Sequence, residues 1–362
     1  MHVSEIETPA LVVDLDICER NLHRVAGYAA EHKLRLRPHT KTHKSIRLAK
    51  RQLELGAAGI TVAKVSEAEV MLAAEPADVL VAFPIVGRGK PERLMAVARR
   101  TRVTVALDSM IAARQLSEAA GAAHVEVGVL AEFDAGLGRV GVPPGELLQL
   151  AQCISKLPHL SFDGITFYPG HIKDLDESGL QALSQLSALV RSILDDFYRA
   201  GMEVRIVSGG STPTLFHSHE IEGLTEIRPG TYVFNDVNTV SSGGCGLEDC
   251  AAAIAATVVS ARPGHMIIDG GSKTFSSDRP VNASEVSFGR LVEAPGARFY
   301  KMNEEHGFID LAGAEREFSV GDRVRVIPNH ICVAVNLHEQ VYGVRGGNVE
   351  EIWKVDARGK LQ

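Results

Sequence analysis

Strand-like and helix-like segments alternate along the first part of the chain, and this alternation restricts the fold more than any other feature. Strand-like runs, most of them apolar, occupy residues 56–63, 78–83, 103–107, 125–130, 162–168 and 204–208. Residues 34–37 alternate apolar and charged side chains as a strand does, and residues 225–228 complete the series. Helical spacing of apolar residues marks the intervening segments 45–55, 91–99, 109–122, 145–157 and 178–200, and also residues 17–31 before the first of these strands. Such alternation predicts a parallel sheet. About eight units, with no Gly-x-Gly-x-x-Gly in the first, favour an α/β fold of the closed (β/α)8 barrel type.

The pattern changes near residue 246, where strand-like runs follow one another without helices between them. These runs lie at residues 252–260, 266–269, 323–327, 340–344 and 349–355. Strands without intervening helices predict a second, all-β domain. We therefore predict a barrel domain over residues 15–245 and a C-terminal β domain over residues 246–362, which also takes in the opening segment 1–14.

Composition excludes several classes of partner. The chain has 362 residues, of which 45% are hydrophobic and 23% charged, as in globular enzymes. A net charge of -7 and a pI near 6.1 argue against nucleic acid or an anionic membrane as the main partner. The five cysteines are widely spaced and no secretory signal precedes them, so we expect a cytoplasmic protein with free thiols. No apolar run approaches the length needed to cross a bilayer.

A polar run, Arg-Pro-His-Thr-Lys-Thr-His-Lys, follows a predicted strand at residues 37–44. Pro38 disfavours helix at the preceding residue, so the run is expected to enter a loop. Lys41 has two interpretations. It is either a solvated surface lysine or an amine whose pKa is lowered by neighbouring positive groups, which would make it a Schiff-base nucleophile. The basic cluster could instead hold a phosphate.

In a barrel of this type the active site lies at the carboxyl ends of the strands. The polar residues predicted at those ends are Lys41, Lys64, Asp108, Ser109, Asp134, Arg139, Tyr168, Gly170, His171, Ser208, Gly209, Gly210, Ser211, Thr212, Gly230, Thr231 and Tyr232. The glycines and hydroxyl groups of residues 208–212 and 230–232 are suited to hold a phosphate, although such residues more often form simple turns. Their place after the last strands matches the usual phosphate position of barrels.

His330 and Cys332 directly follow an apolar strand-like run near the carboxyl end. If the strand continues through them, both side chains point to the same face and can bind one ion. The alternative is a buried cysteine beside an exposed histidine. Two ligands are fewer than a structural zinc site needs, so an ion here would suit catalysis better than a structural role.

Six motifs in the same order together resemble the D-threonine aldolase and D-serine dehydratase family, fold-type III enzymes similar to alanine racemase. The motifs lie at residues 38–44, 64–68, 136–142, 208–212, 305–307 and 330–332, and the resemblance extends from Glu7 to about Gly359. It implies a barrel that binds pyridoxal phosphate, a β domain that contributes a divalent metal, zinc or manganese, and a homodimer. The implied substrates are D-amino acids.

The resemblance also implies roles for individual residues. Lys41 would form the Schiff base with pyridoxal phosphate, and Arg139 and Tyr168 would flank the pyridoxal ring. The phosphate would bind Ser208, Gly209, Gly210, Ser211, Thr212, Gly230, Thr231 and Tyr232. His330 and Cys332 would bind the metal.

The implied activity is that of a lyase on D-configured β-hydroxy-α-amino acids, with two possible outcomes. One is retro-aldol cleavage to glycine and an aldehyde, and the other is elimination to a keto acid and ammonia. The His-x-Cys pair resembles the dehydratases and suits zinc, whereas residues 336–338 and 353–359 look more like the aldolases. An amino-acid racemase and a non-catalytic pyridoxal phosphate carrier are the alternative functions.

Overall fold

The structure is a computed structural model that describes residues 1–280 and 286–362. The chain divides into two compact units, which are described separately. Unit 1 consists of Met1–His23, Thr42–Ser45 and Thr231–Gly359. Unit 2 consists of Arg24–Lys41, Ile46–Gly230 and Lys360–Gln362.

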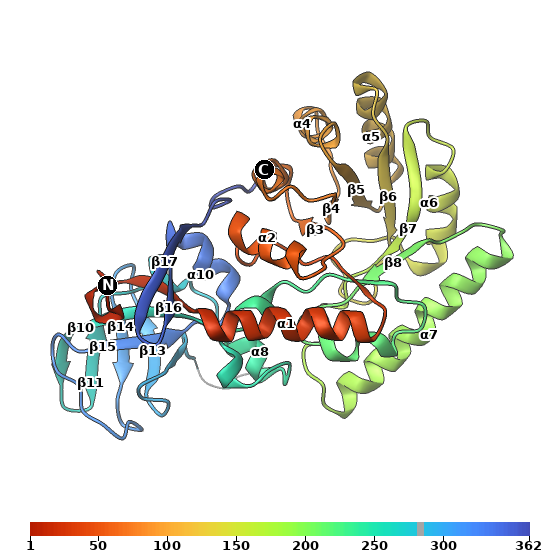
Figure 1. The fold of residues 1–362 in the computed structure, drawn as a ribbon. Coiled ribbons are helices and arrows are strands. Elements are labelled where there is room, and N and C mark those ends of the chain that lie inside the picture. The colour runs from red at the N-terminus through yellow and green to blue at the C-terminus, as the bar shows by residue number, and fades with distance from the viewer. Residues whose placement is uncertain (281–285) are drawn as a thin grey trace. The chain divides into compact units, whose positions relative to one another are not determined.

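Unit 2 contains an eight-stranded sheet whose strands all run parallel, which confirms the predicted barrel. Its order is β2-β9-β8-β7-β6-β5-β4-β3, and a parallel bridge between His39 and Thr61 joins its two ends. The strands are β2 (Arg35–Leu36), β3 (Ile60–Val62), β4 (Asp78–Val81), β5 (Arg102–Leu107), β6 (Val127–Glu132), β7 (Leu160–Thr166), β8 (Ile206–Gly209) and β9 (Glu226–Ile227). Figure 1 shows α4, α5 and α6 beside strands β4 to β7.

The helices of the barrel alternate with its strands along the chain. They are α2 (Ile46–Glu54), α3 (Val65–Met71), α4 (Gly89–Ala98), α5 (Met110–Ala123), α6 (Leu147–Ile154) and α7 (Glu177–Arg199). The helix α1 (Leu15–Glu31) precedes β2. The helix α5 begins where Ser109 accepts a hydrogen bond from the Ala112 N–H, as expected of a capping serine.

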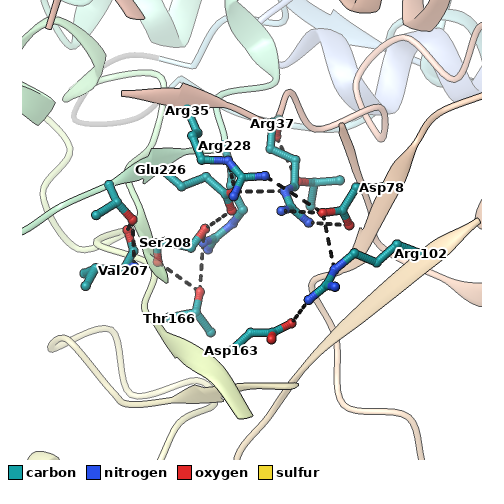
Figure 2. Close-up of polar contacts among 12 residues, drawn as sticks. Arg35, Arg37, Asp78, Arg102, Asp163, Thr166, Val207, Ser208, Glu226 and Arg228 are labelled. Atoms are coloured by element: carbon teal, nitrogen blue, oxygen red, sulfur yellow. Dashed lines mark hydrogen bonds and ion pairs between the residues drawn. The ribbon is translucent and has the colours of Figure 1, made fainter. Parts of the chain in front are cut away.

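The barrel interior contains a network of buried charges, which Figure 2 shows in close-up. Arg37 is fully buried and its guanidinium donates to both carboxylate oxygens of Asp78, at 3.0 and 3.1 Å. Its Nε also donates to Glu226 at 2.9 Å. Burial is the main cause that raises the pKa of Asp78, and the nearby guanidinium groups oppose it. A buried cation with two carboxylate partners satisfies the rule that buried charges are paired.

We predict that Arg37→Met lowers the free energy of unfolding by about 3–5 kcal/mol, because it leaves two carboxylates buried without their partner. Arg35→Met is the matched control. Arg35 lies 3.9 Å from the same two carboxylates, but its side chain is 45% exposed. The control should therefore cost only about 0–1 kcal/mol. Urea unfolding of both variants measures their free energies of unfolding. Equal decreases in the two variants would contradict the conclusion that the buried pairing of Arg37 stabilises the barrel.

Unit 1 contains a second, nine-stranded sheet, which confirms the predicted β domain. Its strands are β1 (Ala10–Asp14), β10 (Ala252–Arg262), β11 (His265–Ile268), β12 (Arg290–Leu291), β13 (Arg298–Met302), β14 (Gly307–Asp310), β15 (Arg323–Ile327), β16 (Gln340–Arg345) and β17 (Asn348–Lys354). As predicted, the opening strand β1 belongs to this sheet, where it pairs with β10 and β16. The strands β12, β13 and β14 were not predicted.

The compact units divide the chain at Gly230, whereas the sequence analysis places a domain boundary at residue 245. The reason lies in α8 (Val237–Ser241), whose first N–H groups donate to unit 1. The Val237 N–H donates to Pro328 O at 3.2 Å and the Asn238 N–H to Asn329 O at 3.1 Å. Within the described parts of the chain, no helix combines the length and apolar character needed to span a bilayer.

Candidate active site

Lys41 lies in the loop that follows β2, and hydrogen bonds fix the backbone just before it. The Thr40 N–H donates to Thr61 O at 2.8 Å. The carboxylate of Glu67, which is fully buried in α3, accepts from Thr40 Oγ1 at 2.8 Å and from the Ala63 N–H at 2.8 Å. Glu67 thus ties the loop of Lys41 to the end of β3. The sequence alone does not identify Glu67, because its partners lie in other elements.

Three predicted residues lie close together at the carboxyl ends of β2, β6 and β7. Lys41 Nζ lies 6.0 Å from the centroid of the Tyr168 ring, and Arg139 Cζ lies 4.9 Å from the same centroid. An aromatic face attracts cations at such distances. The structure therefore brings together the lysine, the arginine and the tyrosine that the sequence marks as catalytic candidates.

A tight turn presents Arg139 beside the ring. The carboxylate of Asp134 accepts hydrogen bonds from the N–H groups of Gly136 at 2.9 Å and Gly138 at 3.0 Å. The bond from Gly138 is the main cause that lowers the pKa of Asp134. Gly138 has φ +68°, in the left-handed region where glycine avoids strain. This turn fixes the backbone next to Arg139.

The turn after β8 has buried backbone N–H groups that find no acceptor within the described residues. Gly209 approaches the Phe167 ring so closely that a Cβ would lie 2.4 Å from it, which explains the glycine. Gly210, Ser211 and Thr212 are buried, and within the described residues their N–H groups donate to nothing. Because buried N–H groups are costly unless paired, a ligand acceptor is expected here. A phosphate supplies such acceptors.

Ser208 and Arg228 form a buried hydrogen-bonded group below that turn (Figure 2). The Ser208 hydroxyl donates to Glu226 Oε1 at 2.6 Å and accepts from Arg228 Nη1 at 2.6 Å. Arg228 also donates to Thr166 Oγ1 at 2.8 Å and to Phe167 O at 3.1 Å. Burial lowers the pKa of the Arg228 guanidinium. Arg228 was not among the predicted site residues, although its position directly after β9 is a signal that could have identified it.

The predicted residues Gly230, Thr231 and Tyr232 lie at the junction of the two units along the chain. Gly230 is buried, and its N–H makes no hydrogen bond within the described residues, like those of the turn after β8. Thr231 opens a short 3-10 helix, and its Oγ1 lies 3.8 Å from Cys332 Sγ within unit 1.

The structure contradicts the strand geometry predicted for His330 and Cys332. His330 is the extended N-terminal cap residue of α10 (Ile331–Leu337), and Cys332 lies in the first turn of that helix. Asp236 explains the difference, because its carboxylate accepts a hydrogen bond from the Ile331 N–H at 3.0 Å and so caps the helix. The imidazole and the thiol nevertheless interact, because the charge of Cys332 is the main cause that raises the pKa of His330.

Asp236 also fixes the His330 ring. Its Oδ2 lies 3.3 Å from His330 Nδ1, while its Oδ1 accepts from the Thr239 N–H and hydroxyl, each at 2.8 Å. The negative charge of Cys332, with a smaller contribution from Asp236, raises the pKa of His330 to about 11. Thr42 Oγ1 lies 3.2 Å from Cys332 Sγ. A histidine whose Nδ1 is held by a carboxylate is typical of metal sites, where Nε2 is the ligand.

A divalent cation fits the chemistry of this pair. Thiolate sulfur and imidazole nitrogen are ligands that zinc prefers, and the surrounding negative charge favours a cation. Over residues 1–280 and 286–362, however, no group of three or more His, Cys, Asp or Glu side chains is arranged to hold a metal. A cation at His330 and Cys332 would therefore need further ligands from substrate or solvent, as in catalytic rather than structural sites.

Two family models match the chain. The alanine racemase N-terminal domain matches residues 13–237, and the putative serine dehydratase domain matches residues 251–344. The chain is 32% identical to 3-hydroxy-D-aspartate aldolase of Paracoccus denitrificans, over 99% of this chain and 94% of that protein.

Solved structures that are similar to the chain also include D-amino acid aldolases and dehydratases. The crystal structure of D-threonine aldolase from Filomicrobium marinum is 32% identical, with a TM-score of 0.91 over 99% of this chain and 98% of that chain. A cysteine-to-alanine mutant of D-threo-3-hydroxyaspartate dehydratase in the metal-free form is 29% identical, with a TM-score of 0.88 over 98% of each chain.

Proposed function

The chain belongs to the D-threonine aldolase and D-serine dehydratase family, and on that premise we propose that it is a pyridoxal phosphate-dependent, metal-assisted lyase of D-configured β-hydroxy-α-amino acids. One observation carries the metal-assisted part of this proposal. It is the pair of His330 and Cys332 at the start of α10, where Asp236 holds the His330 imidazole at 3.3 Å and caps the helix. A racemase of the same fold would need a second acid or base and no metal.

Lys41 would hold the cofactor and transfer protons at its Nζ. Pyridoxal phosphate, when bound, supplies an electron sink for negative charge that develops at the substrate Cα. The N–H groups of Gly210, Ser211 and Thr212 would bind the phosphate, since they are buried and have no acceptor within the described chain. Arg139 would orient the ring from beside Tyr168, which it already contacts.

His330 and Cys332 would hold a divalent metal, which acts as a Lewis acid toward the β-hydroxyl group of the substrate. The soft sulfur ligand favours zinc over manganese. Thr42, the residue after Lys41 in the chain, contacts Cys332 Sγ at 3.2 Å within unit 1.

The proposal is tested by incubating the purified, cofactor-loaded protein with D-threonine, D-serine and 3-hydroxy-D-aspartate, each with zinc, manganese or a chelator. We expect metal-dependent formation of either glycine and an aldehyde or a keto acid and ammonia. The product identifies which bond breaks. Formation of only the L-enantiomer would contradict the proposal in favour of a racemase, and no turnover of any substrate would favour a carrier.

We further propose that the protein is a homodimer, as the family resemblance implies. Sedimentation velocity of the loaded protein checks this directly. A single species of about twice the chain mass of 38.9 kDa is expected, and a monomer at micromolar concentration would contradict it.

A further inference from the structure

Glu132 is a buried acid at the active end of the barrel that the mechanism above does not use. It is the last residue of β6 and is 6% exposed. It pairs in register with Thr166 on β7. Register partners on neighbouring strands point to the same face, and Thr166 points inward, where it accepts a hydrogen bond from Arg228. The Glu132 carboxylate itself makes no hydrogen bond within the described residues.

Three charged groups act on Glu132, and they follow three different strands of the barrel. Arg228 lies after β9 and Asp108 after β5, while Arg139 lies in the loop after β6. Tyr168 follows β7 and, together with Glu132, Asp134 and Arg139, lines one small cavity. The pKa of Glu132 is raised to about 7: burial is the main cause, Asp108 adds to it, and the guanidinium groups of Arg228 and Arg139 oppose it.

The two arginines differ in how they are held. Arg228 is fixed by hydrogen bonds to Thr166 and Ser208, which the close-up shows (Figure 2), and by a third to the Phe167 carbonyl. Arg139 is exposed and makes no hydrogen bond in the part of the chain that the structure describes; its described contact is with the Tyr168 ring. A carboxylate and a guanidinium that make no side-chain hydrogen bond within the described residues therefore line the same small cavity beside Tyr168.

We propose that Glu132 is a positioning residue of the cofactor site, which orients Arg139 and supplies a negative charge that stabilises the protonated form of the lysine-bound cofactor. This inference rests on the proposed function, because it assumes that Lys41 holds the cofactor beside Arg139 and Tyr168. Glu132 is ionised above about pH 7 and neutral below it. Its charge is therefore present under alkaline conditions and lost as the pH falls through neutrality.

Glu132→Gln removes this charge without changing the size of the side chain. A negative charge nearby favours the protonated, yellow form of the lysine-bound cofactor, so its loss should lower the pH midpoint of the yellow-to-colourless conversion by about one pH unit. Absorbance titration of the loaded protein measures this midpoint. Glu132→Asp retains the charge and should keep the midpoint close to that of the wild type. Glu118→Gln is the matched control, since it removes the same charge from an exposed position on α5.

An unmoved midpoint in folded Glu132→Gln, with the yellow band present, would overturn this inference alone. Absence of the yellow band from the wild-type protein would overturn the proposed function, and this inference with it. The double variant Glu132→Gln/Arg139→Gln tests whether Glu132 acts by orienting Arg139 and not through its charge alone. If it orients Arg139, Glu132→Gln should shift the pH midpoint less when Arg139 is already replaced. If Glu132→Gln does not fold, the absorbance titration of the loaded wild-type protein decides. A second inflection of the absorbance near pH 7 supports the inference, and a single transition with no inflection near pH 7 overturns it.

Discussion

Replacing Lys41 with alanine abolishes the yellow absorbance of the lysine-bound cofactor. It also lowers kcat/KM for the cleavage or elimination of the D-amino acid substrate by about 10³-fold. The substitution removes both the amine that holds the cofactor and the group that moves protons at Cα. The structure places Lys41 Nζ 6.0 Å from the Tyr168 ring, with Arg139 on the same ring. Absorbance spectra and steady-state kinetics with D-threonine and D-serine measure the two effects.

Lys64 supplies the control, because it is the other lysine that follows a barrel strand closely. It lies over the Phe83 ring, with Nζ 3.4 Å from the centroid, and burial lowers its pKa. A depressed pKa makes an amine a better nucleophile at neutral pH, so Lys64 is a real competitor for the cofactor. Lys64→Ala should nevertheless keep the yellow band. Loss of the band in Lys64→Ala and its retention in Lys41→Ala would reverse the assignment.

Replacing Cys332 with alanine lowers the rate of cleavage or elimination of the D-amino acid substrate by about 10²- to 10³-fold. The reason is that a Lewis acid stabilises the charge of the transition state by several kcal/mol. The wild type should lose a similar factor when a chelator removes the metal. The variant should lose little more, because its metal is already absent. His330→Ala should behave in the same way. Activity assays with and without chelator measure all three responses.

Cys153→Ala is the matched control for the cysteine substitution, since Cys153 is a free thiol in α6 of the other unit. It should retain both activity and sensitivity to the chelator. Full turnover by Cys332→Ala, together with full turnover of the wild type after chelation, would show that the reaction does not use a metal at this pair.

The barrel was predictable because most of its strands are short, largely apolar segments with a local signal. The exceptions are β2 and β9, which have two residues each, one of them charged. The sequence did not predict β13 and β14, since residues 298–310 mix charged, aromatic and apolar residues without a clear alternation. These strands form through pairing with each other and with β11, which no local pattern specifies. The burial of Arg37 in the barrel interior was also not predicted. An arginine can be buried there because Asp78 and Glu226, which are distant in the sequence, pair with it.

A site residue was predictable where its own chemistry and its place after a predicted strand were sufficient, as for Lys41. It was not predictable where a side chain acts through a distant partner. The run from Ile331 to Val335 is rich in β-branched residues and reads as a strand, yet it forms α10 because Asp236 caps it from 95 residues away. Glu67, Arg228 and Glu132 were missed for the same reason, since their partners or neighbours lie on other strands and helices.

The most direct test is to load the purified protein with pyridoxal phosphate, reduce it with borohydride and locate the added mass by peptide mapping. Reduction fixes the cofactor permanently to the amine that holds it. The account predicts a single modified peptide that contains Lys41. Modification of Lys64 or of another lysine, or no modification of a protein that still turns over D-amino acids, would contradict it.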